Sequence, residues 1–293
     1  MEPSAPAPAH ASVDPGRRLR ILRQHLQTDR LLGVDAVPFV RPAPTQQSPG
    51  KRDSPTPRTA VDTSSRRPNA PAGPAHQTDR PAPSRPPATP AVPSVPADAS
   101  TDEKRHALQQ LDQYQVKGCT RCDLHQSRRQ TVFGEGDPDA ALMIIGEGPG
   151  ADEDRTGRPF VGRAGELLDK QIAAMGLSRD AVYIANVVKC RPPNNRTPTP
   201  QEARTCGDYL QQQVLTIRPR VILTVGGPAA KLLLDTTEGI TRLRGQWHTY
   251  DAIDPPIPVM PTFHPAYLLR SYTKENRAKV WSDLQAVMQQ LQA

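Results

Sequence analysis

Residues 141–165 read ALMIIGEGPGADEDRTGRPFVGRAG and contain the pattern that decides the fold. The run Ala141–Ile145 is short and apolar, which is typical of a buried strand. Glycines and Pro149 follow at once, then three acidic residues and a single aromatic residue, Phe160. In open sheets of alternating strands and helices, ligands bind outside the carboxyl ends of the strands, so this turn is a candidate ligand-facing loop.

Three further apolar runs have the same character, and helical patterns separate them. The expected strands are Leu142–Ile145, Val182–Val187, Val221–Val225 and Val259–Phe263. The expected helices are Asp102–Gln115, Gly162–Met175, one that begins at Thr199-Pro200-Gln201-Glu202, Pro228–Leu234 and Lys274–Gln292. This alternation predicts a parallel sheet with helices on both faces.

Residues 1–100 differ in composition from the rest of the chain. They hold 20 of the 34 prolines and few large apolar residues. Such a segment cannot bury enough apolar surface to offset the entropy of ordering it, so we expect a disordered Pro-rich tail. One exception is residues 16–37, where leucines near helical spacing predict a short helix that either docks on a partner or forms transiently. We expect the folded domain over residues 101–293.

The charge is divided unevenly as well. Residues 1–100 carry 13 Lys and Arg against 8 Asp and Glu, which leaves +2 of the total +7 for residues 101–293. Contacts of the folded part with nucleic acid must therefore come from local clusters of cations. No run reaches the roughly 20 apolar residues of a membrane span, and the N-terminus lacks the regions of a signal peptide. We expect a cytoplasmic protein that makes no membrane contact.

Four cysteines lie in the predicted folded part: Cys119 and Cys122 as a C-x-x-C pair, then Cys190 and Cys206. Structural disulfides are rare in cytosolic proteins. Four thiolates suit either a structural zinc ion or an iron–sulfur cluster, while a redox C-x-x-C pair and unligated thiols are the plainer alternatives. A shared site would hold residues 191–198 in place, which is a structural role.

Gly146–Ala151 formally matches the G-x-G-x-x-G/A fingerprint of dinucleotide-binding folds. We reject that interpretation, because the fingerprint needs a helix to begin at once and the segment DEDRTGRPFVG is acidic and broken by glycine. A pyrophosphate would also face Asp152, Glu153 and Asp154. The next strand ends in an amide, Asn186, where the fingerprint requires an acidic residue.

Two side chains at strand ends are candidate functional groups. The amide of Asn186 offers a donor and an acceptor in one plane, which matches an edge such as that of a pyrimidine, although a turn-forming asparagine explains it equally well. His264 precedes the segment PAYLLR. An apolar wedge backed by a cation suits insertion into a base stack, while a structural histidine before a core-facing helix is the alternative.

Taken together, these motifs resemble one family, the family 4 uracil-DNA glycosylases, which carry a four-iron, four-sulfur cluster. The resemblance covers about residues 118–270 and rests on the C-x-x-C pair, the 146–165 stretch, NVVKCRPPNNRTP at 186–198, Cys206 and HPAYLLR at 264–270. It implies a three-layer α/β/α sandwich with a four-stranded parallel central sheet. It also implies a DNA repair enzyme that flips uracil out of DNA and hydrolyses its N-glycosidic bond, which leaves an abasic site.

The resemblance assigns roles to the matching positions. All four cysteines would ligate a [4Fe–4S] cluster. Phe160 would stack on the flipped uracil, and Asn186 would read its O4 and N3 edge. Backbone around Gly148 and Pro149 and the ring of His264 would meet O2, where the negative charge of the leaving base develops.

The resemblance leaves two candidates for the catalytic carboxylate beside His264. We favour Glu153 for the attacking water and Glu147 for shaping the pocket, and we expect Asp152 and Asp154 to be solvated. Residues proposed for DNA contact are Arg191, Arg196, Leu268, Leu269 and Arg270.

The implied partner is uracil-containing DNA, single- or double-stranded, bound by a monomer whose tail recruits a further protein or acts as a tether. Two other classes of function compete with this interpretation. One is a cluster-bearing nucleic-acid-binding module without turnover. The other is an electron-transfer protein, which the 67 residues between Cys122 and Cys190 disfavour.

Overall fold

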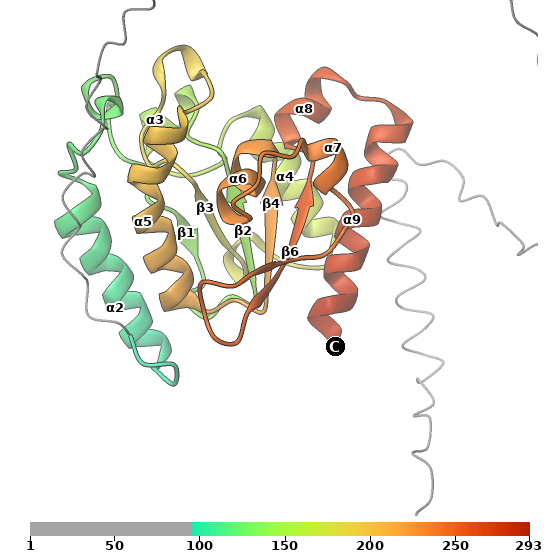
Figure 1. The fold of residues 1–293 in the computed structure, drawn as a ribbon, viewed down its shortest axis with the longest axis horizontal. Coiled ribbons are helices and arrows are strands. Elements are labelled where there is room, and N and C mark those ends of the chain that lie inside the picture. The colour runs from blue at the N-terminus through green and yellow to red at the C-terminus, as the bar shows by residue number, and fades with distance from the viewer. Residues whose placement is uncertain (1–94) are drawn as a thin grey trace, which may run out of the picture. The chain divides into compact units, whose positions relative to one another are not determined.

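The computed structural model describes residues 95–293, so the helix expected at 16–37 and nearly all of the predicted tail lie outside the described residues (Figure 1). Within residues 95–293, six strands form one sheet in the order β1-β3-β2-β4-β6-β5. The strands are β1 (Glu135–Gly136), β2 (Leu142–Gly146), β3 (Tyr183–Asn186), β4 (Val221–Val225), β5 (His248–Tyr250) and β6 (Ile257–Thr262).

The four central strands are the four that the apolar runs predicted. β3, β2, β4 and β6 pair in parallel, which confirms the predicted four-stranded parallel core. The sheet is mixed, however, because β1 and β5 pair antiparallel at its two edges. These edge strands have two and three residues, too few for a periodic pattern in the sequence.

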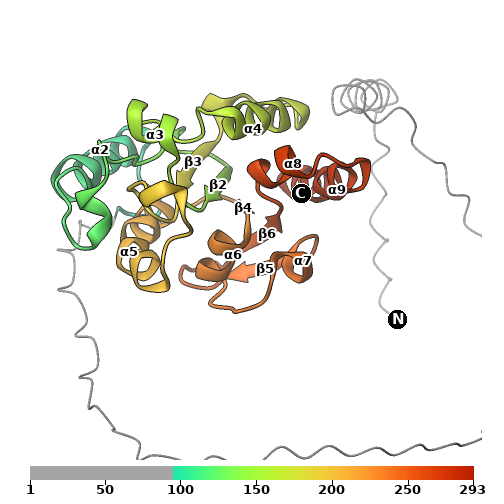
Figure 2. The same cartoon turned by 90° about the horizontal axis from the view of Figure 1, so that it is seen from above.

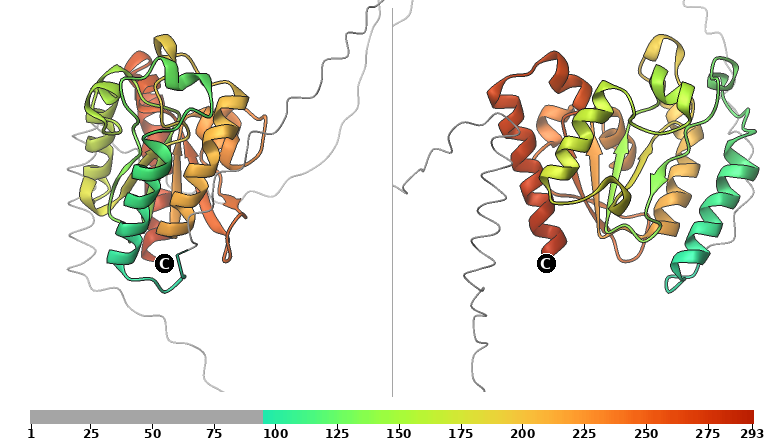
Figure 3. Two further views of the ribbon diagram at one scale, coloured as in Figure 1. Left: turned by 90° about the vertical axis from the view of Figure 1, so that its left-hand side faces the viewer. Right: turned by 180° about the vertical axis from the view of Figure 1, so that it is seen from behind.

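Helices cover both faces of the sheet, as predicted (Figure 2). Successive strand residues point to opposite faces, so Met143 and Ile145 belong to one core cluster and Leu142 and Ile144 to the other. The first cluster packs against α2 (Thr101–Leu111), α5 (Pro200–Ile217) and α6 (Gly227–Leu233). The second packs against α4 (Arg163–Ala174), α8 (Pro265–Arg270) and α9 (Lys274–Gln292). Figure 3 shows α2 beside α5 in its left view and α4 with α9 from behind in its right view.

The helix-start pattern at residue 199 is confirmed in detail. The hydroxyl of Thr199 accepts a hydrogen bond from the backbone N–H of Glu202 at 3.1 Å, and the Glu202 carboxylate accepts one from the N–H of Thr199 at 2.7 Å. This reciprocal capping box begins α5 at Pro200. α2 continues after Leu111 as a π-helical turn, Asp112–Val116, and α7 is a single turn, Ile240–Leu243.

One expectation about the glycine-rich turn is wrong. A helix, α3 (Ala151–Thr156), does begin directly after Gly150. Its acidic first turn suits the positive end of a helix dipole, and it ends after six residues at Gly157, whose φ of 75° only glycine adopts readily. The negative charges of this first turn would still repel a bound pyrophosphate, so the dinucleotide-binding interpretation stays rejected.

Among the described residues, no helix is long and apolar enough to cross a membrane.

Candidate active site

The predicted base-reading residues meet at the carboxyl end of β2. Gly146, the last residue of β2, lies in register with Asn186, the last residue of β3. A Cβ atom on Gly146 would lie 2.4 Å from Oδ1 of Asn186 and 2.4 Å from Cζ of Phe160. The Phe160 ring stacks on the ring of His264, with centroids 5.7 Å apart. Two side chains from distant parts of the sequence therefore meet at a position that only glycine can occupy, and the third, His264, lies against the Phe160 ring.

Asn186 presents an unused acceptor at this point. The residue is 2% exposed, and its Oδ1 atom has no hydrogen-bond partner in the described structure. A buried polar atom without a partner is costly and uncommon, and a bound ligand is one way to satisfy it. The amide is thus poised to accept a hydrogen bond from a ligand.

The hydrogen bonds of His264 determine its tautomer. Its Nδ1 atom accepts a hydrogen bond from the backbone N–H of Ala266 at 3.0 Å, which caps α8. A neutral ring that accepts at Nδ1 carries its proton on Nε2. Burial, with the nearby charge of Arg270 as a smaller cause, lowers the pKa of His264 to about 4. At neutral pH this histidine is therefore an uncharged donor through Nε2.

Phe160 is held in an unusual backbone conformation. Its φ is 51°, in the left-handed region that aromatic residues rarely adopt. The side chain is 5% exposed. α4 approaches its backbone so closely that a Cβ atom on Gly165 would lie 1.9 Å from the Phe160 carbonyl oxygen. The conformation thus depends on contacts around residue 160 and not on local preference.

Glu147, Gly148 and Pro149 lie between β2 and α3. Glu147 is half-buried, and burial raises the pKa of its carboxyl, while a hydrogen bond with Thr197 opposes the rise. A Cβ atom on Gly148 would lie 2.7 Å from a methyl group of Val188, so glycine permits the close approach of the two loops. Pro149 is buried.

Glu153 has both carboxylate oxygens engaged with the backbone. Oε2 accepts from the N–H of Gly150 at 3.0 Å, and Oε1 accepts from the N–H groups of Val161 and Gly162 at 2.9 and 3.1 Å. Asp154 is not solvated as expected, since it is 1% exposed and accepts a hydrogen bond from the N–H of Arg129. These acidic residues hold loops in place.

The four cysteines line one cavity, together with Lys189, Tyr209 and other residues. Burial raises the pKa values of Cys122 and Cys190, and that of Cys206 to about 12. The Cys190 sulfur accepts a hydrogen bond from Arg128 at 3.0 Å, and the Cys206 sulfur accepts one from the N–H of Lys189 at 3.3 Å.

The donor atoms around this cavity bear on which ligand the thiols suit. In residues 95–293, no group of three or more His, Cys, Asp or Glu is arranged to hold a metal ion. The four thiols nevertheless line one shared cavity, and N–H donors are directed at two of the sulfurs. Four cysteine thiolates are the donor set of an iron–sulfur cluster, and hydrogen bonds to the sulfurs tune such a cluster, so these residues fit that group.

The residues proposed for DNA contact differ in exposure. Arg270 is exposed and Leu269 is 37% exposed, whereas Leu268 is 2% exposed and belongs to the core beneath α8. Arg196 is exposed but makes two hydrogen bonds to Glu202. Arg191 is half-buried and bonds the side chain of Asn195. The apolar surface after His264 is therefore formed by Leu269 and its neighbours and not by Leu268.

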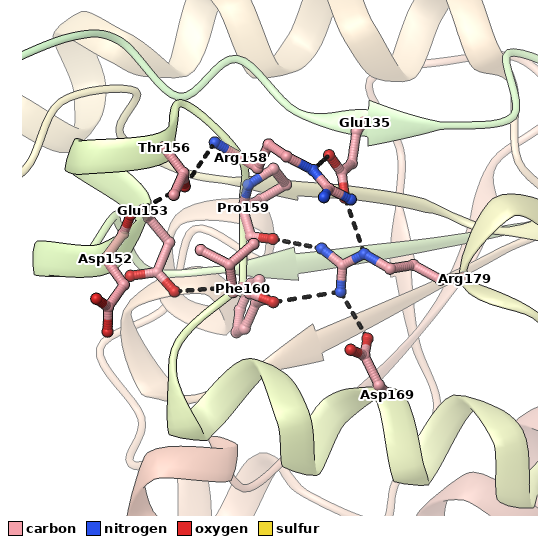
Figure 4. Close-up of polar contacts among 10 residues, drawn as sticks. Glu135, Asp152, Glu153, Thr156, Arg158, Pro159, Phe160, Asp169 and Arg179 are labelled. Atoms are coloured by element: carbon pink, nitrogen blue, oxygen red, sulfur yellow. Dashed lines mark hydrogen bonds and ion pairs between the residues drawn. The ribbon is translucent and has the colours of Figure 1, made fainter.

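Arg179 is the main residue near the site that sequence reasoning missed. It lies in a short 3₁₀ turn, Arg179–Ala181, yet its guanidinium reaches the backbone of Pro159 and Phe160 (Figure 4). A lone arginine 19 residues after Phe160 carries no motif. Only the packing of the turn against the loop brings the two together.

Comparison with known proteins shows the family to which this chain is similar. A family model described as the uracil DNA glycosylase superfamily matches residues 133–285. The chain is 47% identical over 188 residues to a type-4 uracil-DNA glycosylase of Thermotoga maritima, a match that covers 62% of this chain and 93% of that protein. It is 41% identical over 177 residues to a type-4 uracil-DNA glycosylase of Archaeoglobus fulgidus, covering 59% and 88%.

The chain belongs to the uracil DNA glycosylase superfamily. A type-5 uracil-DNA glycosylase of Pyrobaculum aerophilum is also similar, at 34% identity over 147 residues, covering 40% of this chain and 65% of that protein. The type-4 relatives match at higher identity and over more of their length. The resemblance to the family 4 enzymes that the motifs indicated is thus confirmed.

Proposed function

We propose that this protein is a DNA repair enzyme that flips uracil out of DNA and hydrolyses the bond between the base and its sugar. One observation carries the proposal: the unpartnered amide oxygen of Asn186 lies beside the Phe160 ring, and that ring stacks on a neutral His264. These groups provide an edge for reading a base, a face for stacking and a donor for its leaving charge. A binding module without turnover has no need of the third.

Asn186 selects uracil by its hydrogen-bond pattern. Its Oδ1 accepts from N3–H of uracil, while its amide nitrogen donates to O4. Cytosine presents the reverse pattern, with an acceptor at N3 and a donor at its exocyclic amine. Binding cytosine would leave buried groups on both partners unpaired, which a polar site rejects strongly. Phe160 supplies the stacking face, and the enzyme must offset the few kcal/mol needed to flip the base.

His264 stabilises the leaving group. As the bond from the sugar C1′ to uracil N1 breaks, the electron pair stays with the base and negative charge collects on O2. A neutral ring with its proton on Nε2 donates a hydrogen bond to this oxygen without giving up the proton. Such preorganised donors act on developing charge as an oxyanion hole does. Backbone N–H groups around Gly148 assist, and Pro149, which has no N–H, stiffens the turn that aims them.

Glu147 is a better candidate than Glu153 for the carboxylate that faces the cationic sugar and orients water. Both oxygens of Glu153 already accept backbone hydrogen bonds. Burial raises the pKa of Glu147, and a carboxylate with a higher pKa is a stronger base. The water oxygen bonds to C1′ as the bond to uracil N1 breaks, and one water proton passes to this carboxylate. Uracil leaves as its anion and takes up that proton through solvent, so the products are free uracil and an abasic site.

Cys119, Cys122, Cys190 and Cys206 would hold a [4Fe–4S] cluster, whose contribution is to cross-link the chain and not to take part in hydrolysis. Cys190 precedes residues 191–198, and Cys206 lies in the following helix, so ligation would brace this segment from both ends. Arg191 and Arg196 then lie on a fixed loop for contact with DNA phosphates. Leu269 and Arg270 supply the apolar and cationic contacts after His264.

The test is alkaline cleavage of a labelled oligonucleotide with one central uracil, beside an otherwise identical thymine oligonucleotide. We expect cleavage of the uracil strand alone, and its loss in Asn186→Ala. Gln212→Ala is a matched control, because Gln212 also has a buried amide oxygen without a partner but lies near the end of α5 that leads away from the site. Binding of uracil-containing DNA without cleavage by the wild-type protein would favour the module without turnover.

A further inference from the structure

Four consecutive residues that present the Phe160 ring are held from two sides by charged side chains. The carbonyl oxygens of Pro159 and Phe160 accept hydrogen bonds from Arg179, the latter at 3.3 Å. The N–H groups of Val161 and Gly162 donate to Glu153 at 2.9 and 3.1 Å. Figure 4 shows Arg179 and Glu153 on opposite sides of this segment.

Arg179 is itself fixed by two carboxylates. Its Nε atom donates to Glu135 at 2.8 Å and its Nη1 atom to Asp169 at 2.6 Å. Its side chain is 18% exposed. One guanidinium thus joins the edge strand β1, the helix α4 and two carbonyls of the loop. The planar fork of arginine can serve four acceptors at once, which a lysine ammonium with three donors cannot.

The loop needs such a support because its central residue is strained. An aromatic residue with a φ of 51° persists only where the surroundings impose it. The carbonyl of Phe160 faces Gly165, where no side chain can intervene. Arg179 bonds this same carbonyl and the one before it. The peptide groups on either side of Phe160 orient its ring, and the carbonyl oxygens of both accept hydrogen bonds from Arg179.

We propose that Arg179 is a positioning residue that keeps the Phe160 ring in place to stack on the flipped base, acting opposite Glu153. The inference rests on the proposed function, since Phe160 needs accurate placement only if it receives a base. Arg158 distinguishes this role from a general contribution of charge. Its guanidinium makes two hydrogen bonds to the same Glu135, at 2.8 and 3.0 Å, whereas the loop carbonyls are bonded by Arg179 (Figure 4).

The experiment compares Arg179→Gln, Arg179→Lys and Arg158→Gln with the wild-type protein. Three quantities are measured: the single-turnover rate of uracil release at saturating enzyme, inhibition by free uracil, and affinity for DNA with a stable abasic-site analogue. A shift of the ring by about 1 Å costs up to about 100-fold in rate. For Arg179→Gln we expect a rate loss of about 10- to 100-fold, with inhibition by free uracil weakened in parallel.

Affinity for abasic-site DNA should stay within about threefold in all variants, because backbone contacts dominate it. Arg158→Gln should keep the wild-type rate and uracil inhibition. Arg179→Lys keeps a cation between Glu135 and Asp169, so it tests the positioning role even if the glutamine variant is unstable. We expect its rate of uracil release to lie between those of Arg179→Gln and the wild-type protein.

Equal losses in Arg179→Gln and Arg158→Gln would overturn the inference, as would normal uracil inhibition in both Arg179 variants. A parallel fall in unfolding temperature, DNA affinity and rate would mean that Arg179 only stabilises the fold, and it would also overturn the inference. Failure of the wild-type protein to release uracil would instead refute the proposed function.

Discussion

Gly146→Ala should inactivate the protein while leaving it folded. The added Cβ atom would lie 2.4 Å from Cζ of Phe160 and 2.4 Å from Oδ1 of Asn186, against an ordinary contact distance of at least 3.4 Å. The two groups that we propose to read the base must therefore each move by about 1 Å, the difference between those two distances. Both neighbours are side chains, so the backbone of β2 can stay in its register.

The expected effects on rate and on stability differ in size. A 1 Å displacement at a reacting centre costs about 100-fold in rate, and here both the stacking face and the reading edge move. Overpacking one methyl group in a filled site costs about 1–3 kcal/mol of stability, which is less than the whole stability of a typical domain. We expect single-turnover uracil release to fall at least about 100-fold.

The assay is single-turnover release of uracil from a uracil-containing oligonucleotide, with thermal unfolding measured on the same preparation. Gly239→Ala is the matched control, because a Cβ atom there meets nothing within 4 Å, and it should retain the wild-type rate. A folded Gly146→Ala protein that keeps more than a third of the wild-type rate would show that Phe160 and Asn186 do not read the base together at Gly146.

Three further perturbations test other parts of the molecule. His264 has a pKa of about 4 in the folded protein against about 6.5 in an unfolded chain, so its contribution to stability is full above pH 6.5 and is lost as the pH falls toward 4. The pH–rate profile should then show no ionisation near pH 6.5, and an acid limb at that pH would contradict a neutral donor. Cys206→Ser should remove at least half of the bound iron and lower the unfolding temperature, whereas unchanged iron content would exclude Cys206 as a ligand. Asp283→Ala should cost about 3–5 kcal/mol in urea unfolding, because Asp283 is 1% exposed and binds both Arg244 and Thr262; a loss below about 1 kcal/mol would mean that Arg244 finds another partner.

The central strands and main helices were predictable because their causes are local. Val221–Val225 is apolar except for Thr224, and both of its faces are buried. The start of α5 follows from Thr199 and Glu202, whose side chains cap the helix within one turn. The edge strands and α3 were not predicted. β1 has only two residues and exists because Glu135 pairs with Ile184, far along the chain.

The features of the site also fall into those that the sequence determined and those that only the tertiary structure decided. The sequence by itself determined which residue types were available: an aromatic ring after a glycine turn, an amide and a histidine at strand ends, and four cysteines in two pairs. Residue types and their order are properties of the sequence itself, and a motif is defined by them. Motifs alone were therefore enough to propose Phe160, Asn186 and His264 as candidate base-reading residues.

Only the tertiary structure decided what each side chain does. It brought Phe160 and Asn186 to Gly146 and stacked His264 on the Phe160 ring. It engaged Glu153 with three backbone N–H groups, which is why we propose Glu147 for the contact with water. The physical reason is that hydrogen-bond partners and burial depend on segments that are distant in sequence and adjacent in space. The spacing of residues along the chain therefore cannot predict these hydrogen-bond partners or this burial.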